Sequence, residues 1–219
     1  MNTTSNNDQF SCALDDILHP GSRHLFRHWE SVRGEQSAPL KSDIDLKHLK
    51  DQLPHIGILQ RHALKSAYRW RLAGTAICRL FGSEVTNTEF MAGWHPFERK
   101  SIAQALDSTV GGHQPCVARL KAQNKYGDIV GLELLALPVI TKEANVTHLL
   151  VGLSQFRELD KIHPRALTDF ELSRLKMIWT EHAKAKVHAV LANDPHAPQT
   201  GAPERPVFRV IDGGLHNQN

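Results

Sequence analysis

The sequence has few cysteines and no long apolar run, and each shortage excludes a class of protein. Its three cysteines, Cys12, Cys78 and Cys116, are an odd number at wide spacing, so they indicate neither a disulfide framework nor a zinc pattern. The longest apolar run, residues 129–140, is interrupted by Glu133 and a proline and is too short to span a bilayer. We therefore expect a cytoplasmic protein that does not enter a membrane.

Catalytic motifs are also missing. The sequence contains no Gly-x-Ser-x-Gly, no phosphate-binding loop and no signature of the cyclic-dinucleotide enzymes. The net charge of +3 comes from lysines and arginines spread along the chain, which does not by itself predict a nucleic-acid partner. Lys176, Lys184 and Lys186 keep nucleic-acid binding as a less favoured alternative, because Glu181 and apolar residues interrupt them. We expect no enzymatic activity and a function in binding and signalling.

The most informative segment runs from Tyr68 to Gly82. Tyr68, Trp70 and Leu72 alternate with two arginines, which is the period-two pattern of a strand with one buried face. From Gly74 the apolar spacing becomes that of a short helix, and Gly82 can adopt the left-handed conformation that ends it. A strand that turns directly into short helices, with long strands further on, is typical of a small α+β sensor domain.

An amphipathic helix is predicted near the N-terminus, over residues 22–33. Its apolar stripe consists of Leu25, Phe26, Trp29 and Val32. Two large aromatic side chains on so short a helix must be covered, either by the domain's own sheet or by the same helix of a second chain. We therefore predict these four residues as interface residues, either within the domain or in a homodimer.

Further elements follow from similar patterns. Strands are expected at residues 56–61, 68–72, 116–123, 129–139 and 148–156, and a longer helix from Pro96 to Val110. The strand at 129–139 is apolar on both faces apart from Glu133, so both of its faces should be covered. Glu133 is expected to face outwards and to pair with Arg119 or Lys121 across the hairpin, with a role in a pocket or an interface as the alternative.

The chain divides into four predicted parts. Residues 1–18 form a disordered N-terminal tail, 19–159 the domain with its N-terminal helix, 160–192 a C-terminal helical extension, and 193–219 a proline-rich linker and tail. The extension is predicted to be helical because Thr168 and Glu171 have the spacing of a capping box.

The chain resembles PAS domains in the order of its predicted elements and in several short motifs. The most specific motif is Arg71-Leu72-Ala73-Gly74-Thr75-Ala76-Ile77-Cys78, and the others lie at residues 26–34, 43–45, 53–55 and 209–214. More narrowly, these stretches are similar to a PAS-type family of alphaproteobacteria that was long known only as a domain of unknown function. The resemblance covers residues 20–159 together with the terminal motif.

This resemblance implies a five-stranded antiparallel sheet with helices on one face. With the predicted terminal helices, the expected fold class is α+β and PAS-like. Members of the family are regulatory, are usually dimeric and include stand-alone adaptors in motility or cell-cycle signalling, with no common ligand or activity established. We therefore expect a non-enzymatic regulator that acts through protein contacts, as a homodimer with signalling proteins as its partners.

The alternative function is a sensor of a small apolar ligand that controls the C-terminal helix. In a PAS domain such a cavity lies between the inner face of the sheet and the helices, and pockets of this kind are largely apolar. The ligand-lining residues would then be Trp70, Leu72, Ile77, Phe81, Ile102, Leu106, Leu120 and Leu134.

Three less favoured alternatives involve a cofactor or a metal. Cys78 invites comparison with the reactive cysteine of flavin-binding light sensors, but the rest of their motif is missing. Haem-binding PAS domains use a histidine on the long helix, which His95 and His113 only flank. His24 and His28 have a spacing that can bind zinc, but no third ligand is close in sequence. We therefore predict no cofactor and no metal.

Overall fold

The computed structural model of the chain describes residues 14–62, 67–141, 148–157 and 166–180. Within these residues the helices are α2 (Pro20–Arg33), α3 (Thr75–Phe81) and α4 (Pro96–Gly112), with the 3₁₀ helices η1 (Lys41–Asp43) and η2 (Leu46–His55). The strands are β1 (Ile56–Arg61), β2 (Tyr68–Ala73), β3 (Cys116–Asn124), β4 (Ile129–Val139), β5 (His148–Gln155) and β6 (Leu167–Met177).

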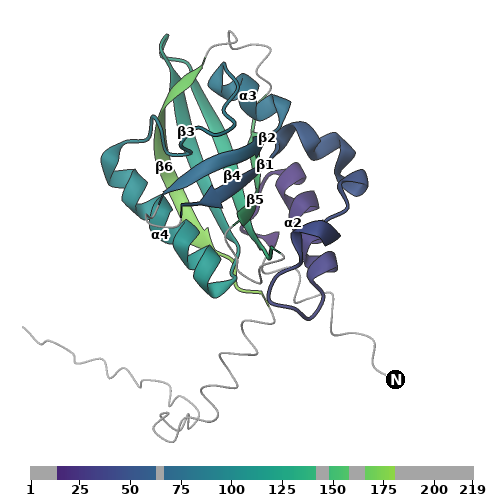
Figure 1. Cartoon of the computed structure of the whole chain (residues 1–219). Helices are drawn as coiled ribbons and strands as arrows, with labels where there is room; N and C mark the ends of the chain where they lie inside the picture. The colour runs from purple at the N-terminus through teal and green to yellow at the C-terminus, as the bar shows by residue number, and fades with distance from the viewer. Residues whose placement is uncertain (1–13, 63–66, 142–147, 158–165, 181–219) are drawn as a thin grey trace, which may run out of the picture.

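The strands form one antiparallel sheet in the order β2-β1-β5-β4-β3-β6. The α+β, PAS-like fold class is confirmed, since the first five strands form the expected antiparallel sheet. Figure 1 shows this sheet with α4 on one side and α2 on the other. β6 extends the sheet beyond β3, and this sixth strand was not predicted.

The sheet is covered on both faces, which we call the inner face and the outer face according to the helices that pack against them. The inner face packs against α3 and α4 in an inner cluster that includes Trp70, Ile77 and Leu106. The outer face packs against α2 and η2 in an outer cluster that includes Phe26 and Trp29. β4 supplies residues to both clusters, because alternate side chains of a strand point to opposite faces. The predicted cover on both sides of β4 is present.

The predicted N-terminal helix is α2, and its apolar stripe covers the chain's own outer face. Leu25, Phe26 and Trp29 are buried there, whereas Val32 is partly exposed. The indole Nε1 of Trp29 donates a hydrogen bond to the carbonyl oxygen of Pro138 at 2.9 Å. Of the two ways to cover the stripe, the structure shows burial within the chain. A dimer contact through the three buried side chains is therefore wrong.

Glu133 lies in the middle of β4, and its side chain is fully buried. One carboxylate oxygen accepts the backbone N–H of Leu18 at 2.8 Å, and the other accepts the N–H of His19 at 2.9 Å. The expected pairing with Arg119 or Lys121 is wrong, because the carboxylate binds the backbone just before α2. A buried carboxylate needs such donors, and the positive end of a helix dipole favours its charge. Glu133 therefore fixes α2 to the sheet.

Residues 14–18 belong to the folded domain, although the sequence placed them in a disordered tail. Ile17 is fully buried in the outer cluster, and the ammonium group of Lys176 on β6 binds the carboxylate of Asp16. The tail prediction extended the polar composition of the first residues too far along the chain. Residues 1–13 lie outside the described residues.

β6 takes the place of the first part of the predicted C-terminal helix. Its register with β3 shifts at Arg119/Leu120 and at Gln123/Asn124, and each shift leaves one extra residue on β6. Two such bulges change the period-two alternation of a strand. The residues that pair with the inner-face positions of β3 are therefore spaced alternately by three and by two, at Leu167, Phe170, Leu172, Leu175 and Met177.

The domain consequently extends past residue 159. The predicted helical extension at 160–192 is wrong over Leu167–Met177, because this segment completes the sheet and contributes Leu167 and Phe170 to the inner cluster. The rest of that extension beyond Thr180, and the predicted linker and tail at 193–219, lie outside the described residues.

Candidate functional site

The inner cluster contains seven of the eight predicted ligand-lining residues. They are Trp70, Ile77, Ile102, Leu106, Leu120 and Leu134, all buried, with Phe81 partly buried against them. The strand and helix periods placed these residues on the correct face. Their role in binding a ligand stays a prediction.

Aromatic rings on the inner face contact one another. Trp70 lies 6.2 Å from Phe81 and 5.4 Å from Phe90, measured between ring centroids. Phe170 of β6 stacks on Phe81 at 5.4 Å and on Trp94 at 5.7 Å. These rings therefore contact one another on the inner face, where the sequence predicted the lining of a ligand cavity.

Leu72 is the exception, and its predicted position on the inner face is wrong. Leu59 pairs with Trp70 while Ile58 pairs with Leu72, so β2 carries one extra residue, Arg71, opposite β1. This β-bulge interrupts the alternation that began at Tyr68. Leu72 therefore lies on the outer face and is 52% exposed.

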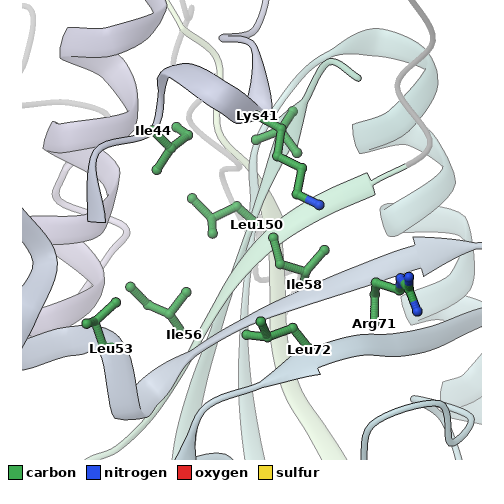
Figure 2. A pocket seen from close by; sticks show the side chains of 9 residues that line it. Lys41, Ile44, Leu53, Ile56, Ile58, Arg71, Leu72 and Leu150 are labelled. Atoms are coloured by element: carbon green, nitrogen blue, oxygen red, sulfur yellow. The ribbon is translucent and has the colours of Figure 1, made fainter. Parts of the chain in front are cut away.

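The bulge opens onto a groove on the outer face with a volume of about 520 Å³. Its floor comes from β1, β4 and β5, one wall from η2 and the segment around η1, and its edge from β2. Figure 2 shows the side chains that line it. They are Lys41, Ile44, Leu53, Ile56, Ile58, Arg71, Leu72, Val139 and Leu150.

Two cationic side chains line this groove, and its other lining residues are apolar. In Figure 2, Lys41 and Arg71 lie towards one side of the groove, and Ile44 and Leu53 lie towards the other. Within the part of the chain that the structure describes, neither the Lys41 ammonium nor the Arg71 guanidinium has an ion pair or a side-chain hydrogen bond. The groove was not predicted, because the bulge that forms it leaves no local mark in the sequence.

A polar contact joins the sheet to α4. The Asp107 carboxylate accepts a hydrogen bond from the Tyr68 hydroxyl at 2.8 Å and one from Nε of Arg61 at 2.8 Å. Burial, together with the Asp107 carboxylate, raises the pKa of Tyr68. The hydroxyl therefore stays protonated and acts as a donor that holds α4 in place. Asp107 is not among the residues that the sequence predicted for a site.

The histidines of α2 lie beside η2. The His28 ring stacks on the His48 ring with 5.7 Å between centroids, and Nε2 of His24 lies 3.0 Å from the carbonyl oxygen of His48. Burial and the neighbouring His48 lower the pKa of His28. Among the described residues, no group of three or more histidine, cysteine or acidic side chains could hold a metal ion. The zinc alternative for His24 and His28 has no support here.

The structure also places the other candidates for cofactor binding. Cys78 is partly buried on α3, and its thiol makes a weak 3.9 Å contact with the carbonyl oxygen of Ala73. Burial raises the pKa of the Cys116 thiol to about 11, which makes it a poor nucleophile. His95 and His113 flank α4; His95 is exposed, and Nδ1 of His113 lies 2.7 Å from the Ser37 hydroxyl.

The antiparallel order of the first five strands, with α3 and α4 on the inner face, places this protein in the class of PAS-like domains. A family model described as PAS domain matches residues 17–154. The chain therefore belongs to the PAS domain family. A comparison with curated proteins finds no match.

Solved structures of PAS and light-oxygen-voltage domains are similar to the chain at low identity. One, titled for a flavin analogue in a light-oxygen-voltage domain, shares 15% identity and a TM-score of 0.40, covering 68% of this chain and 95% of that one. A PAS domain from Colwellia psychrerythraea shares 14% identity and a TM-score of 0.38, covering 51% and 96%. A sensory box histidine kinase/response regulator from Burkholderia thailandensis shares 11% and a TM-score of 0.36, covering 51% and 85%.

No helix among the described residues is both long enough and apolar enough to cross a membrane.

Proposed function

We propose that this PAS domain is a non-enzymatic regulator that acts through protein contacts in bacterial signalling, in the cytoplasm. The observation that supports this proposal is the composition of the inner cluster. A ligand-binding PAS face needs an apolar opening among its side chains. Here Trp70, Phe81, Phe90 and Phe170 contact one another across that face.

Native mass spectrometry of the purified full chain tests this proposal. The expected result is a spectrum in which every charge state corresponds to the polypeptide alone or to its oligomers. A small molecule that co-purifies with the protein would contradict the proposal if methyl NMR shows that it shifts the signals of Ile77 and Ile102, both buried in the inner cluster.

A homodimer is part of the proposal. Because Leu25, Phe26 and Trp29 are buried within the chain, Val32 is the member of the α2 stripe that remains partly exposed for such a contact. Sedimentation velocity over a hundredfold range of concentration should show a dimer, and a monomer at every concentration would contradict this part. Val32→Asp should weaken the dimer if α2 lies at the contact, with the exposed Arg27→Asp as the matched control.

The partners can be sought by affinity capture from the native host. The bait should be compared with a truncation that ends after Thr180, because a cut at residue 159 would remove β6 from the sheet. A signalling protein captured by both baits would indicate that residues 1–180 carry the contact. Loss of capture with the shorter bait would assign it to the C-terminal segment.

The second candidate function is the ligand sensor, and one contact favours it. Phe81 of α3 stacks on Phe170 of β6, so a molecule that displaced the Phe81 ring would also displace the last strand. In this function β6 takes the transmitting role that was predicted for a C-terminal helix. A co-purified or added ligand that shifts inner-face signals and also speeds amide exchange in β6 would favour this sensor over the contact-based regulator.

A further inference from the structure

We propose that the outer-face groove binds an anionic amphiphile, a molecule with an aliphatic chain and a carboxylate head group. This site is separate from the inner cluster, where the PAS ligand was expected. The proposal does not depend on whether the domain signals through protein contacts.

The size and lining of the groove fit such a molecule. Its volume of about 520 Å³ lies within the range of roughly 300–1,000 Å³ that is usual for small-molecule sites. The floor is aliphatic, from Ile56 and Ile58 of β1 and Leu150 of β5, with Leu53 of η2 as one wall. Small-molecule sites combine such a lining with a few polar groups that orient the ligand.

The charge of the groove selects an anion. Lys41 and Arg71 line it, and none of its lining residues is acidic. Neither cation has an ion pair or a side-chain hydrogen bond among the residues that the structure describes. A guanidinium group binds a carboxylate through two parallel hydrogen bonds, and an ammonium group adds a point charge. A head group between them, with its chain extended towards Ile44 and Leu53, matches the arrangement in Figure 2.

The fold sets the backbone positions from which both cationic side chains extend. The N–H of Lys41 donates to the carbonyl oxygen of Ile140 at 2.9 Å, and the N–H of Ile140 donates to that of Pro39 at 2.9 Å. These bonds attach the segment before η1 to the end of β4. Arg71 is the extra residue of the β2 bulge, next to Leu72 on the outer face. A preformed site loses less conformational freedom when it binds.

The strands under the groove favour an alkyl chain over an extended peptide. β1 is paired with β2 on one side and with β5 on the other, and β5 is also paired with β4. Their backbone groups are therefore already used within the sheet. A peptide laid on this floor would find no backbone partners for its own N–H and C=O groups, which are costly to leave unpaired. An aliphatic chain carries no such groups.

The test is a calorimetric titration of the full-length protein with monomeric octanoate, decanoate and dodecanoate. Affinity should rise roughly four-fold for each added methylene that is buried. 1-Decanol should bind about 25-fold more weakly than decanoate, because it loses the charge pairing with both Lys41 and Arg71, each worth about five-fold. Decyltrimethylammonium should not bind. No binding of decanoate or dodecanoate at millimolar concentration would overturn the proposal, as would equal binding of the anion and the cation.

Three variants separate the groove from non-specific binding. Lys41→Gln and Arg71→Gln should each weaken decanoate binding about five-fold, and Leu72→Asp should abolish it, since it places a carboxylate at the edge of the groove. Arg69→Gln is the matched control, because Arg69 is an exposed arginine of the same strand that does not line the groove. Circular dichroism verifies that each variant is folded. Unchanged affinity in both glutamine variants would overturn the proposal.

Methyl NMR locates the bound molecule. Decanoate should shift the methyl signals of Ile44, Ile56 and Ile58 in the groove and leave those of Ile77 and Ile102 in place. Shifts confined to the last two would overturn the proposal and indicate the inner face instead. A co-sedimentation assay with phosphatidylglycerol vesicles separates a free amphiphile from a membrane lipid. Binding to vesicles without binding of monomeric decanoate would also overturn the proposal.

Discussion

The two faces of the sheet differ in what they add to apolar packing. The inner face carries a group of contacting rings from α3, β2, β6 and the loop between α3 and α4. The outer face is covered by α2 and η2, and α2 buries Leu25, Phe26 and Trp29 against it. Two polar contacts also hold α2 there, one to the buried carboxylate of Glu133 and one from the Trp29 indole to the carbonyl oxygen of Pro138. Both faces are therefore packed, but the outer face adds buried polar contacts and keeps an open groove.

This difference indicates which face can respond to a signal. Interdigitated rings are costly to displace, because each loses many contacts when it moves. Besides its apolar packing, the outer face contains charged groups at α2 and the groove, and the hydrogen bonds of a charged group are lost when that charge is removed. We therefore expect a change in charge to act on α2 and the groove, and the inner face to serve as the rigid support.

The largest effect is expected from Trp70→Ala. Trp70 contacts Phe81 and Phe90 and is almost fully buried, so its removal leaves a cavity in the inner cluster. The free energy of unfolding should fall by about 3–5 kcal/mol, measured by urea denaturation. Trp179→Ala is the matched control, because that side chain is 53% exposed, and its effect should stay within about 0.5 kcal/mol. Similar losses in the two variants would contradict a close-packed inner face.

A smaller effect is expected from Glu133→Ala on the outer face. The substitution leaves the backbone N–H groups of Leu18 and His19 without their acceptor. Such a loss costs about 1–3 kcal/mol of the free energy of unfolding. Hydrogen exchange should show faster exchange in α2 than in α4. As a control, Glu171→Ala removes a largely exposed carboxylate from β6 and should change little. Equal acceleration in both helices would remove the distinction between the two faces.

A fall in pH should also destabilise the outer face before the inner face. Burial lowers the pKa of His19, which precedes α2, and the pKa of His28, which lies on it. The unfolded chain therefore takes up protons near pH 6.5 that the folded chain does not, and the free energy of unfolding decreases as the pH falls below that value. His19→Asn keeps an N-cap acceptor and should reduce the slope between pH 7 and 5. A slope that is flat in the wild type, or unchanged in the variant, would contradict this prediction.

The smallest effect is expected from Leu72→Ala. Because Leu72 lies on the outer face and is 52% exposed, the free energy of unfolding should change by about 0.5 kcal/mol or less. Ile77→Ala, which truncates a fully buried residue of the inner cluster, should cost about 2–5 kcal/mol. Thermal denaturation of both variants makes the comparison. A large loss for Leu72→Ala would place that side chain on the inner face, as its alternation with Tyr68 and Trp70 suggested.

Local signals in the sequence were sufficient for much of the fold. The strand at 56–61, the start of α4 at Pro96 and the left-handed Gly82 after α3 all follow from residues close together in the chain. Such caps and periods depend on nearest neighbours, so they can be read without knowing the tertiary structure.

The features that were missed depend on partners distant in sequence. The alternation of β6 is changed by bulges against β3, and its spacing of three and two residues is close enough to a helical pattern to be mistaken for one. Glu133 is buried because it binds backbone groups more than a hundred positions away in the sequence. Leu72 changes face because the register of β1 requires it. The candidate groove depends on the same bulge, so it could not be predicted either.

The extra residue in β2 shows how a charge can be added to a surface without altering the rest of a sheet. On either side of Arg71, Trp70 still faces α3, and Leu72 still pairs with Ile58. If Arg71 were deleted, the two strands would match residue for residue, and every neighbour would keep its face. A single-codon insertion or deletion at this position therefore adds or removes a guanidinium group. Related domains that differ at this position would share the same core and differ in the ligand that the groove binds.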